Sequence, residues 1–176
     1  VNDIDKPILE AYGYDKKIFR QKILQLVYSH DVLVAHNGHN FDFPILRRLL
    51  GESLHHKILI DTMLDLPHPF NKTIDSYKLN YLCLQYKVIM MEAHRAIHDV
   101  IGLSQLMNCF AFDDILALSK EPVVKIIAKV SIADKDKPKN KKFLFDNVAK
   151  EWYFKARKRF AEKKITTLDF EYTTNG

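Results

Sequence analysis

A short apolar run between two helical patterns constrains the fold of this chain more than any other feature. The run lies within HDVLVAHN, residues 30–37; it has the length of a strand and ends in polar residues. Before it, KKIFRQKILQLVY (16–28) repeats apolar residues at helical spacing, and after it FDFPILRRLLGE (41–52) returns to that spacing, with Gly51 as a stop. Helix, strand and helix in this order favour an α/β fold.

The same rhythm recurs downstream. HKILIDTMLDL (56–66) predicts a strand over 57–60 with a turn at Asp61, and Pro67 and Pro69 mark a loop. SYKLNYLCLQYKV (76–88) and HRAIHDVIGLSQLMNCF (94–110) predict two further helices. We expect these apolar residues of the helices at 41–52, 76–88 and 94–110 to face a core: Ile45, Leu46, Leu49, Leu50, Leu79, Leu82, Cys83, Tyr86, Ile97, Val100, Ile101 and Leu106.

In the C-terminal third the helical patterns give way to strand patterns and a lysine-rich segment. This change predicts a separate module. VVKIIAKVSI (123–132) predicts a strand and ADKDKPKNKK (133–142) a loop. FLFDNVAKEWYFKARKRF (143–160) predicts a strand, a turn near Asn147, and a second strand or helix that carries Trp152. We therefore divide the chain into an α/β domain at 1–118 and a small α+β module at 119–176.

The basic charge belongs to that module. Residues 120–164 hold 15 Lys or Arg against 6 Asp or Glu, and the rest of the chain holds 12 against 16. Lysines that neutralise phosphates release counterions, so a basic appendage on a moderately acidic body fits an enzyme that gathers phosphates near its cleft. A merely solvated surface is the other interpretation of this charge.

The sequence also bears on location. No apolar run approaches the roughly 20 residues that span a bilayer. Cys83 and Cys109 lie in apolar, helix-like stretches without a CxxC pair, which indicates two buried thiols in a reducing compartment. We therefore expect an intracellular, cytoplasmic protein with no membrane association.

Two segments together carry the strongest chemical signal. In LVAHNGHNFDFPIL (33–46) a strand delivers the chain to a turn, and Asp42 stands near the start of the next helix. In HRAIHD (94–99) His94 precedes Asp99 by five residues, which places His94 on the entering loop and Asp99 inside the helix. Strand ends and helix N-termini converge on one crevice, so Asp42 and Asp99 could bind a divalent cation there beside a phosphate. A mobile His beside such an Asp is suited to activating water.

The two segments resemble motifs II and III of the DEDD superfamily of 3′→5′ exonucleases, in its histidine-type subfamily, which includes polymerase proofreading subunits. The resemblance covers residues 16–107 and implies a ribonuclease H-like exonuclease fold, with a mixed sheet flanked by helices and here a small basic α+β C-terminal appendage. It implies that Asp42 and Asp99 are metal ligands, that His94 is the general base, and that Asn37 contacts substrate.

The activity implied by the resemblance is removal of nucleotides from a 3′ end with two divalent cations, Mg²⁺ or Mn²⁺. Carboxylate oxygens are the ligands that such hard ions prefer. The implied substrate is nucleic acid, with DNA favoured over RNA, and the implied partner is a polymerase or another replication protein.

The first motif of that family, Asp-x-Glu on a central strand, does not stand upstream of residue 16. The terminal LDFEYTTNG (168–176) contains Asp169 and Glu171, which would point to the same side of a strand. Two interpretations stay open. Either a circular permutation inserts this strand into the sheet and completes the site, or the Asp-x-Glu is a coincidence in an ordinary tail.

Two other functions fit the same residues. The first is a catalytically incomplete nucleic-acid-binding module, in which aromatic residues interleaved with basic ones form a stacking platform; these are Phe143, Phe145, Trp152, Tyr153 and Phe154. The second is a zinc hydrolase, since His94 and His98 stand four apart and His36 and His39 add two imidazoles. That hypothesis lacks the Glu between the paired histidines that a metalloprotease would use.

Overall fold

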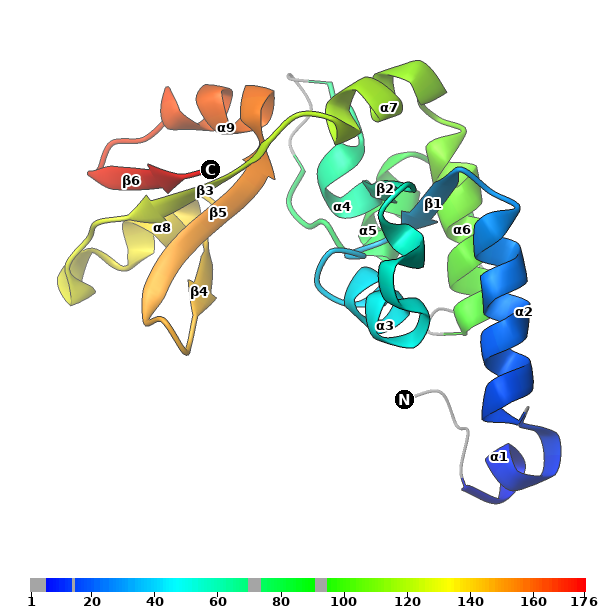
Figure 1. The fold of residues 1–176 in the computed structure, drawn as a ribbon. Coiled ribbons are helices and arrows are strands. Elements are labelled where there is room, and N and C mark those ends of the chain that lie inside the picture. The colour runs from blue at the N-terminus through cyan, green and yellow to red at the C-terminus, as the bar shows by residue number, and fades with distance from the viewer. Residues whose placement is uncertain (1–5, 14, 70–73, 91–94) are drawn as a thin grey trace.

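The computed structural model describes residues 6–13, 15–69, 74–90 and 95–176, and Figure 1 shows their arrangement. Its first part follows the predicted alternation of helices and strands. A short helix α1 (Lys6–Tyr12) precedes α2 (Lys16–Tyr28), β1 (Val32–Ala35), α3 (Asp42–Leu50), the 3₁₀ helix η1 (Gly51–Leu54) and β2 (Ile58–Asp61). The expected helix at 16–28 and the expected strands within 30–37 and 56–66 are confirmed.

Local signals set the ends of these helices. The side chain of Asp15 accepts the N–H groups of Lys17 and Ile18, at 2.8 and 3.4 Å, which begins α2. Gly51 has a φ of 66°, a conformation that glycine adopts without steric cost, and it ends α3 where the sequence predicted a stop.

The strands β1 and β2 form a parallel pair in which Val32 lies opposite Ile58 and Ala35 opposite Asp61. Side chains alternate between the two faces of a strand. On one face, Val32 and Val34 pack into a cluster with buried residues of the helices α5 (Leu79–Gln85), α6 (Ala96–Met107) and α7 (Phe112–Ser119). On the other face, Leu33 packs with residues of α2, α3 and η1. Helices therefore cover both faces of the pair, with the short α4 (Thr62–Asp65) directly after β2.

Most of the residues of α6 that were expected in the core are exposed, whereas in α3 Leu46, Leu49 and Leu50 face the core as expected. In α6 the core residues are Leu103 and Leu106, whereas Ile97, Val100 and Ile101 are 64%, 60% and 45% exposed. The sheet of the described residues has only the strands β1 and β2 here, so it offers no further strand to cover this side of α6.

The same kind of correction applies to α3 and to one cysteine. Phe43 is buried in α3, but Ile45 is exposed. Cys83 is buried as expected; Cys109 is exposed, because it follows the last turn of α6, and both thiols are free.

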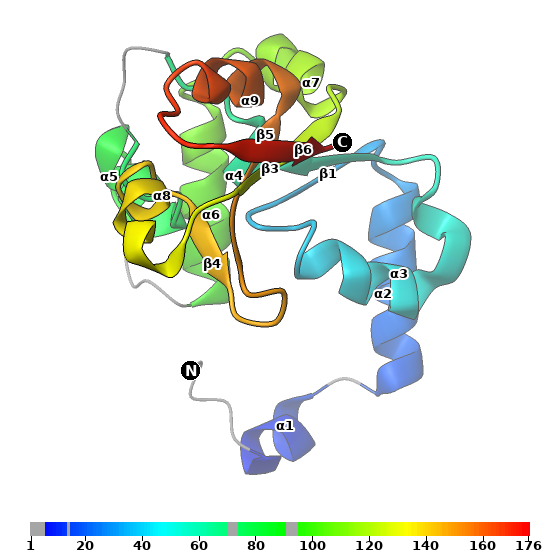
Figure 2. The same ribbon diagram turned by 90° about the vertical axis from the view of Figure 1, so that its left-hand side faces the viewer.

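The C-terminal part forms an antiparallel sheet with the order β4-β5-β3-β6. Its strands are β3 (Val123–Ala128), β4 (Leu144–Asp146), β5 (Glu151–Arg157) and β6 (Tyr172–Asn175), and α9 (Lys158–Ile165) packs on one face, as Figure 2 shows from the side of this sheet. The turn near Asn147 is confirmed: the side chain of Asp146 accepts the N–H groups of Val148 and Ala149.

The lysine-rich segment expected as a loop instead holds a 3₁₀ turn, η2 (Ile132–Asp134), and a short helix, α8 (Asp136–Asn140). Pro138 lies in the first turn of α8, where its missing N–H costs nothing, and it is buried. An ion pair at 2.9 Å between Lys137 and Asp134 ties the two elements together. Charge alone suggested a loop, but the buried proline provides an apolar anchor.

The terminal strand answers the question raised by the Asp-x-Glu pair. β6 pairs antiparallel with β3, with Tyr172 opposite Ala128, so it belongs to the C-terminal sheet and not beside β1. Asp169 and Glu171 precede β6 and are not part of a strand. The permutation that would have inserted them into the first sheet is therefore wrong.

The chain is of the α/β class, as expected, but its strands form a parallel pair and a separate antiparallel sheet in place of one mixed sheet. The ribonuclease H-like assignment and the division at residue 118 stay predictions. No single helix of the described segments is long and apolar enough to cross a membrane; α6 and α7 together reach the length and composition, with a bend of 102° between them.

A buried ion pair joins the C-terminal sheet to the helix α4, which follows β2. Arg157, at the end of β5, donates from Nε and Nη2 to the carboxylate of Asp65 in α4, at 2.6 and 3.1 Å. Asp65 is fully buried and Arg157 is 6% exposed. A third bond, 2.6 Å from Nη1 to the carbonyl of Glu121, fixes the guanidinium on the far side. Removing one partner of such a pair leaves a buried charge uncompensated, which costs about 3–5 kcal/mol.

Candidate functional site

The candidate site is built on the loop that leaves β1. Asn37 adopts a φ of 60°, and its carbonyl accepts the N–H groups of Asn40 and Phe41, which curls the loop into the start of α3. Gly38 permits a close approach: a Cβ there would lie 2.7 Å from Ala35 and from the ring of Phe43. The loop thus passes directly over a buried aromatic ring, and this positions Asp42 at the first residue of α3.

Asp61, the last residue of β2, holds this loop in place. Its carboxylate accepts the backbone N–H groups of Asn37 at 2.8 Å, His39 at 3.0 Å and Met63 at 3.1 Å. Asp61 is 1% exposed, so its carboxylate has almost no contact with water. The three N–H groups take the place of the missing water as hydrogen-bond donors. One side chain therefore fixes both the loop after β1 and the first turn of α4.

Asp65 continues the connection one turn later. It accepts the N–H of Asp61 at 2.8 Å and also binds Arg157, as described above. The polar chain thus runs from the loop at Asn37 and His39, through Asp61 and Asp65, to Arg157 in the C-terminal sheet. We call these three residues, Asp61, Asp65 and Arg157, the buried relay.

His36 lies at the start of the same loop. Its Nε2 donates to the carbonyl of Tyr77 at 2.8 Å. In the neutral ring Nδ1 is therefore the acceptor, and it accepts a hydrogen bond from the hydroxyl of Thr62 at 2.9 Å. If the ring is protonated, Nδ1 becomes a donor, and the Thr62 hydroxyl can turn to the carbonyl of Ala35, 3.3 Å away. Burial lowers the pKa of His36, against the opposing effects of the Tyr77 carbonyl and of the carboxylates of Asp61, Asp42 and Asp99.

The two carboxylates that the sequence singled out both act on the pKa of His36. Asp42 begins α3 and Asp99 lies in the first turn of α6, and the negative charge of each reaches His36. Desolvation raises the pKa of Asp42, and the charge of Asp61 adds to this increase. Both residues thus lie in the first turn of a helix and influence the same imidazole, and their union in one site stays a prediction.

The other predicted residues have mixed outcomes. His94 lies outside the described residues. Asn37 contributes its backbone N–H to Asp61, and its side-chain oxygen accepts from Asn40 at 2.7 Å. Within residues 6–13, 15–69, 74–90 and 95–176, no group of three His, Cys, Asp or Glu side chains could hold a metal ion. Asp42 and Asp99 therefore do not make a complete metal site with the residues described.

The zinc hypothesis gains no support from the imidazoles near the loop. Both ring nitrogens of His36 already have hydrogen-bond partners. His39 packs edge-on against Phe43 with ring centroids 5.4 Å apart, and its Nε2 is buried without a partner among the described residues.

Sequence reasoning missed the buried relay. Asp61 was noted only as a turn, and Asp65 and Arg157 were not singled out. A signal existed for the first two, because in ILIDTMLD two acidic residues stand four apart directly after an apolar strand. Arg157 had no such signal among the many basic residues around it.

The C-terminal sheet contributes one cation near the loop. Tyr153, Lys155 and Arg157 alternate on β5 and share a face. Arg157 is held by Asp65, and the charge of Lys155 acts on the pKa of His39, which burial chiefly lowers. On the same face, Lys125 bonds Glu151 at 2.6 Å and lies over the ring of Tyr153. The side chain of Lys155 makes no hydrogen bond or ion pair with a described residue.

The members of the predicted aromatic platform do not share one face, because those on β5 alternate between its two faces. Phe143 is buried, and Trp152 and Phe154 pack against the core of the C-terminal sheet. Phe145 lies against Trp152 on that side. Alternation along β5 is the reason, and it leaves Tyr153 as the aromatic residue of the set on the face shared with Lys155.

Comparison with known proteins finds no counterpart for this arrangement: no family model, no curated protein and no solved structure matches the chain.

The pKa of His36 predicts a pH dependence of stability. Its pKa is lowered from 6.5, so below pH 6.5 the unfolded chain binds more protons than the folded one. The stabilising contribution is complete above pH 6.5 and is lost as the pH falls. We expect His36→Gln to flatten this slope in urea unfolding midpoints measured from pH 5 to 8.

His39 contributes in the same direction as His36, so part of the slope should persist in His36→Gln. The raised pKa of Asp42 changes stability in the opposite direction, so its contribution falls as the pH rises. That change begins near pH 3.8, the ordinary pKa of the group. An unchanged slope in His36→Gln would contradict the assignment.

Proposed function

We propose that this chain is the core of a 3′→5′ exonuclease that acts on nucleic acid. The observation that carries the proposal is that Asp42, at the start of α3, and Asp99, in the first turn of α6, both act electrostatically on His36, which directly follows β1. The buried relay supports it, because Asp61 accepts two backbone N–H groups of the loop between His36 and Asp42 and so fixes the path of the chain into α3. DNA as the preferred substrate and a polymerase partner rest on the resemblance of motifs alone.

The cations of the proposed reaction are Mg²⁺ or Mn²⁺, which would activate water and stabilise the leaving oxygen. Asp42 and Asp99 have the right donor atoms, but they lack a third protein ligand among the described residues. Mg²⁺ is often bound by one or two carboxylates together with substrate phosphates. We therefore infer that cations bind weakly to this part of the chain in the absence of nucleic acid.

His94 is the proposed general base, although it lies outside the described residues. Its place in the sequence supports this role, since it stands five residues before Asp99 and just before the N-terminus of α6 at Ala96. Five residues along an ideal helix would leave two side chains well apart in angle. A base placed before the helix is not held to that angle, so it could reach a water near Asp99.

The exonuclease proposal is tested by Asp42→Asn and Asp99→Asn. Each variant keeps the size of the side chain and removes the charge of a ligand. We expect each to reduce Mg²⁺-dependent release of mononucleotides from a 3′ end by at least about 100-fold, since losing even an outer-shell partner of a ligand costs 10–100-fold. The measurement is the rate of nucleotide release with and without Mg²⁺.

Asp113→Asn is the matched control, because Asp113 also stands in the first turn of a helix but is exposed on α7. It should retain the full rate. Full activity in both Asp42→Asn and Asp99→Asn would overturn the assignment of these two residues.

A nucleic-acid-binding module without catalysis is the second candidate. Two observations favour it. The described residues provide no third ligand beside Asp42 and Asp99, and the Lys155 side chain, on the same face of β5 as Tyr153 and acting on the pKa of His39, has no partner among them. A tyrosine ring and a free ammonium on one strand suit a base and a phosphate of a single strand. This function predicts salt-sensitive binding with no release of nucleotides in the presence of Mg²⁺.

Both candidates place nucleic acid against the face of β5, which Lys155→Gln tests. We expect the variant to lower the slope of log affinity against log salt for a single-stranded oligonucleotide by about 0.7, the loss of one phosphate contact. Titrations at several salt concentrations without Mg²⁺ measure it. Lys135→Gln is the control, since Lys135 lies in the basic segment but off the sheet; equal effects of the two variants would refute the contact.

A further inference from the structure

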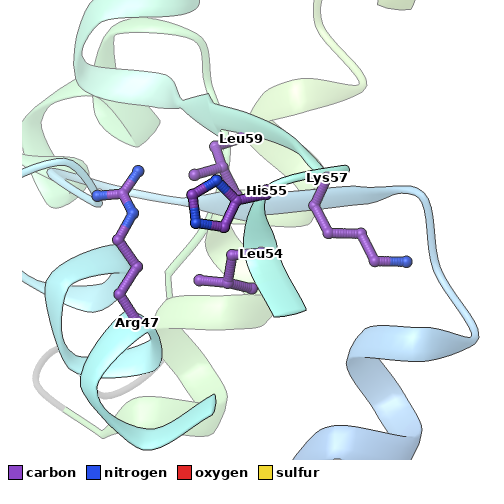
Figure 3. Close-up of a pocket in the computed structure, with 5 residues that line it drawn as sticks. All are labelled: Arg47, Leu54, His55, Lys57 and Leu59. Atoms are coloured by element: carbon purple, nitrogen blue, oxygen red, sulfur yellow. The ribbon is translucent and has the colours of Figure 1, made fainter. Parts of the chain in front are cut away.

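We propose that a pocket at the far end of α3 binds a phosphate group. The pocket has a volume of about 260 Å³ and is lined by Arg47, Leu54, His55, Lys57 and Leu59 (Figure 3). It lies at the N-terminal end of β2 and the C-terminal end of α3, whereas Asp42 begins α3. It is therefore separate from the candidate site, and its occupancy does not depend on the proposed function.

The local chain path creates the pocket. After α3, Gly51 turns the backbone with its positive φ, and η1 carries the chain back toward β2. The N–H of Lys57 closes this turn on the carbonyl of Leu54 at 3.1 Å. Arg47, in the last turn of α3, and His55, directly after η1, consequently line the same cavity. In Figure 3 the imidazole of His55 lies between Leu59 and Leu54, and the guanidinium of Arg47 stands to its left.

The charges around the pocket are all of one sign. No acidic side chain lines it among the described residues. The side chain of Arg47 makes no hydrogen bond or ion pair with any described residue, so the five N–H donors of its guanidinium remain available. Lys57 is anchored by a bond of 2.8 Å from Nζ to the carbonyl of His30, which spends one of its three donors and neutralises no charge.

This combination fits a phosphate ester better than a bare ion. Arginine binds phosphate oxygens through two parallel bonds, and the buried Leu54 beneath it lowers the local dielectric. Since a water molecule takes about 30 Å³, the cavity holds a phosphate together with part of the group attached to it. The phosphate could belong to a free monoester or to the backbone of a strand, and both sources present the same oxygens.

The ordinary explanation for Arg47 is a favourable interaction with the dipole of α3, because cations in the last turn stabilise the negative end of a helix. Arg48 separates that explanation from the proposal. It occupies the same last turn and carries the same charge, but it does not line the pocket. Arg47→Gln and Arg48→Gln therefore remove equal charge from the same helix end, and differ only in the cavity.

The test is calorimetric titration without Mg²⁺, using inorganic phosphate, a nucleoside 5′-monophosphate and a single-stranded oligonucleotide with unphosphorylated ends. We expect Arg47→Gln to weaken binding of at least one probe by about tenfold, the lower limit for charge-assisted bonds, and Arg48→Gln to change it less than about twofold. Arg47→Lys keeps the charge but loses the two-bond geometry, so it should fall between the two.

The probes identify the source of the phosphate. Weaker binding of the monophosphate assigns the pocket to free phosphate esters, and a loss confined to the oligonucleotide assigns it to a backbone phosphate. Equal effects of Arg47→Gln and Arg48→Gln, or no effect of Arg47→Gln on any probe, would overturn the proposal. Arg47 is exposed, so unfolding curves should match those of the native protein; if Arg47→Gln does not fold, Arg47→Lys carries the comparison.

Discussion

The buried pair between Asp65 and Arg157 is the interaction on which the arrangement of this molecule depends. It joins residues 92 positions apart and locks a strand of the C-terminal sheet to the helix that follows β2. Buried ion pairs rarely add net stability over a well-packed apolar contact, but they are costly to break. The pair therefore acts chiefly as a constraint on position, and its bond to the backbone of Asp61 extends that constraint to the loop after β1.

The candidate site inherits its geometry from this constraint. Asp61 holds the backbone at Asn37 and His39, and those residues lead directly to Asp42. The same relay turns the face of β5 that carries Lys155 toward His39. One polar chain thus links the strand β5, proposed to contact nucleic acid, to the loop that leads to the proposed ligand Asp42. The phosphate pocket at Arg47 lies outside it, at the other end of α3.

Local features of this fold were predictable from the sequence, and long-range ones were not. The apolar spacing of 16–28 predicted α2 with its observed ends, and the pattern around Val32 predicted β1. The inner side of α6 was not predictable, because it depends on how many strands stand beside it. Likewise Asp42 and Asp99 could be proposed from their positions at helix starts, whereas the partner of Asp65 could not be chosen among the 15 basic residues of 120–164.

The central claim is that the relay holds the loop after β1, and amide hydrogen exchange at Asn37 and His39 tests it most directly. These N–H groups bond a carboxylate, not a neighbouring strand, so their protection reports on Asp61. In Arg157→Met the charge of Asp65 is left unpaired, and the account predicts that both amides lose protection while those within α2 keep theirs. Unchanged protection at Asn37 and His39 in a folded Arg157→Met variant would contradict it.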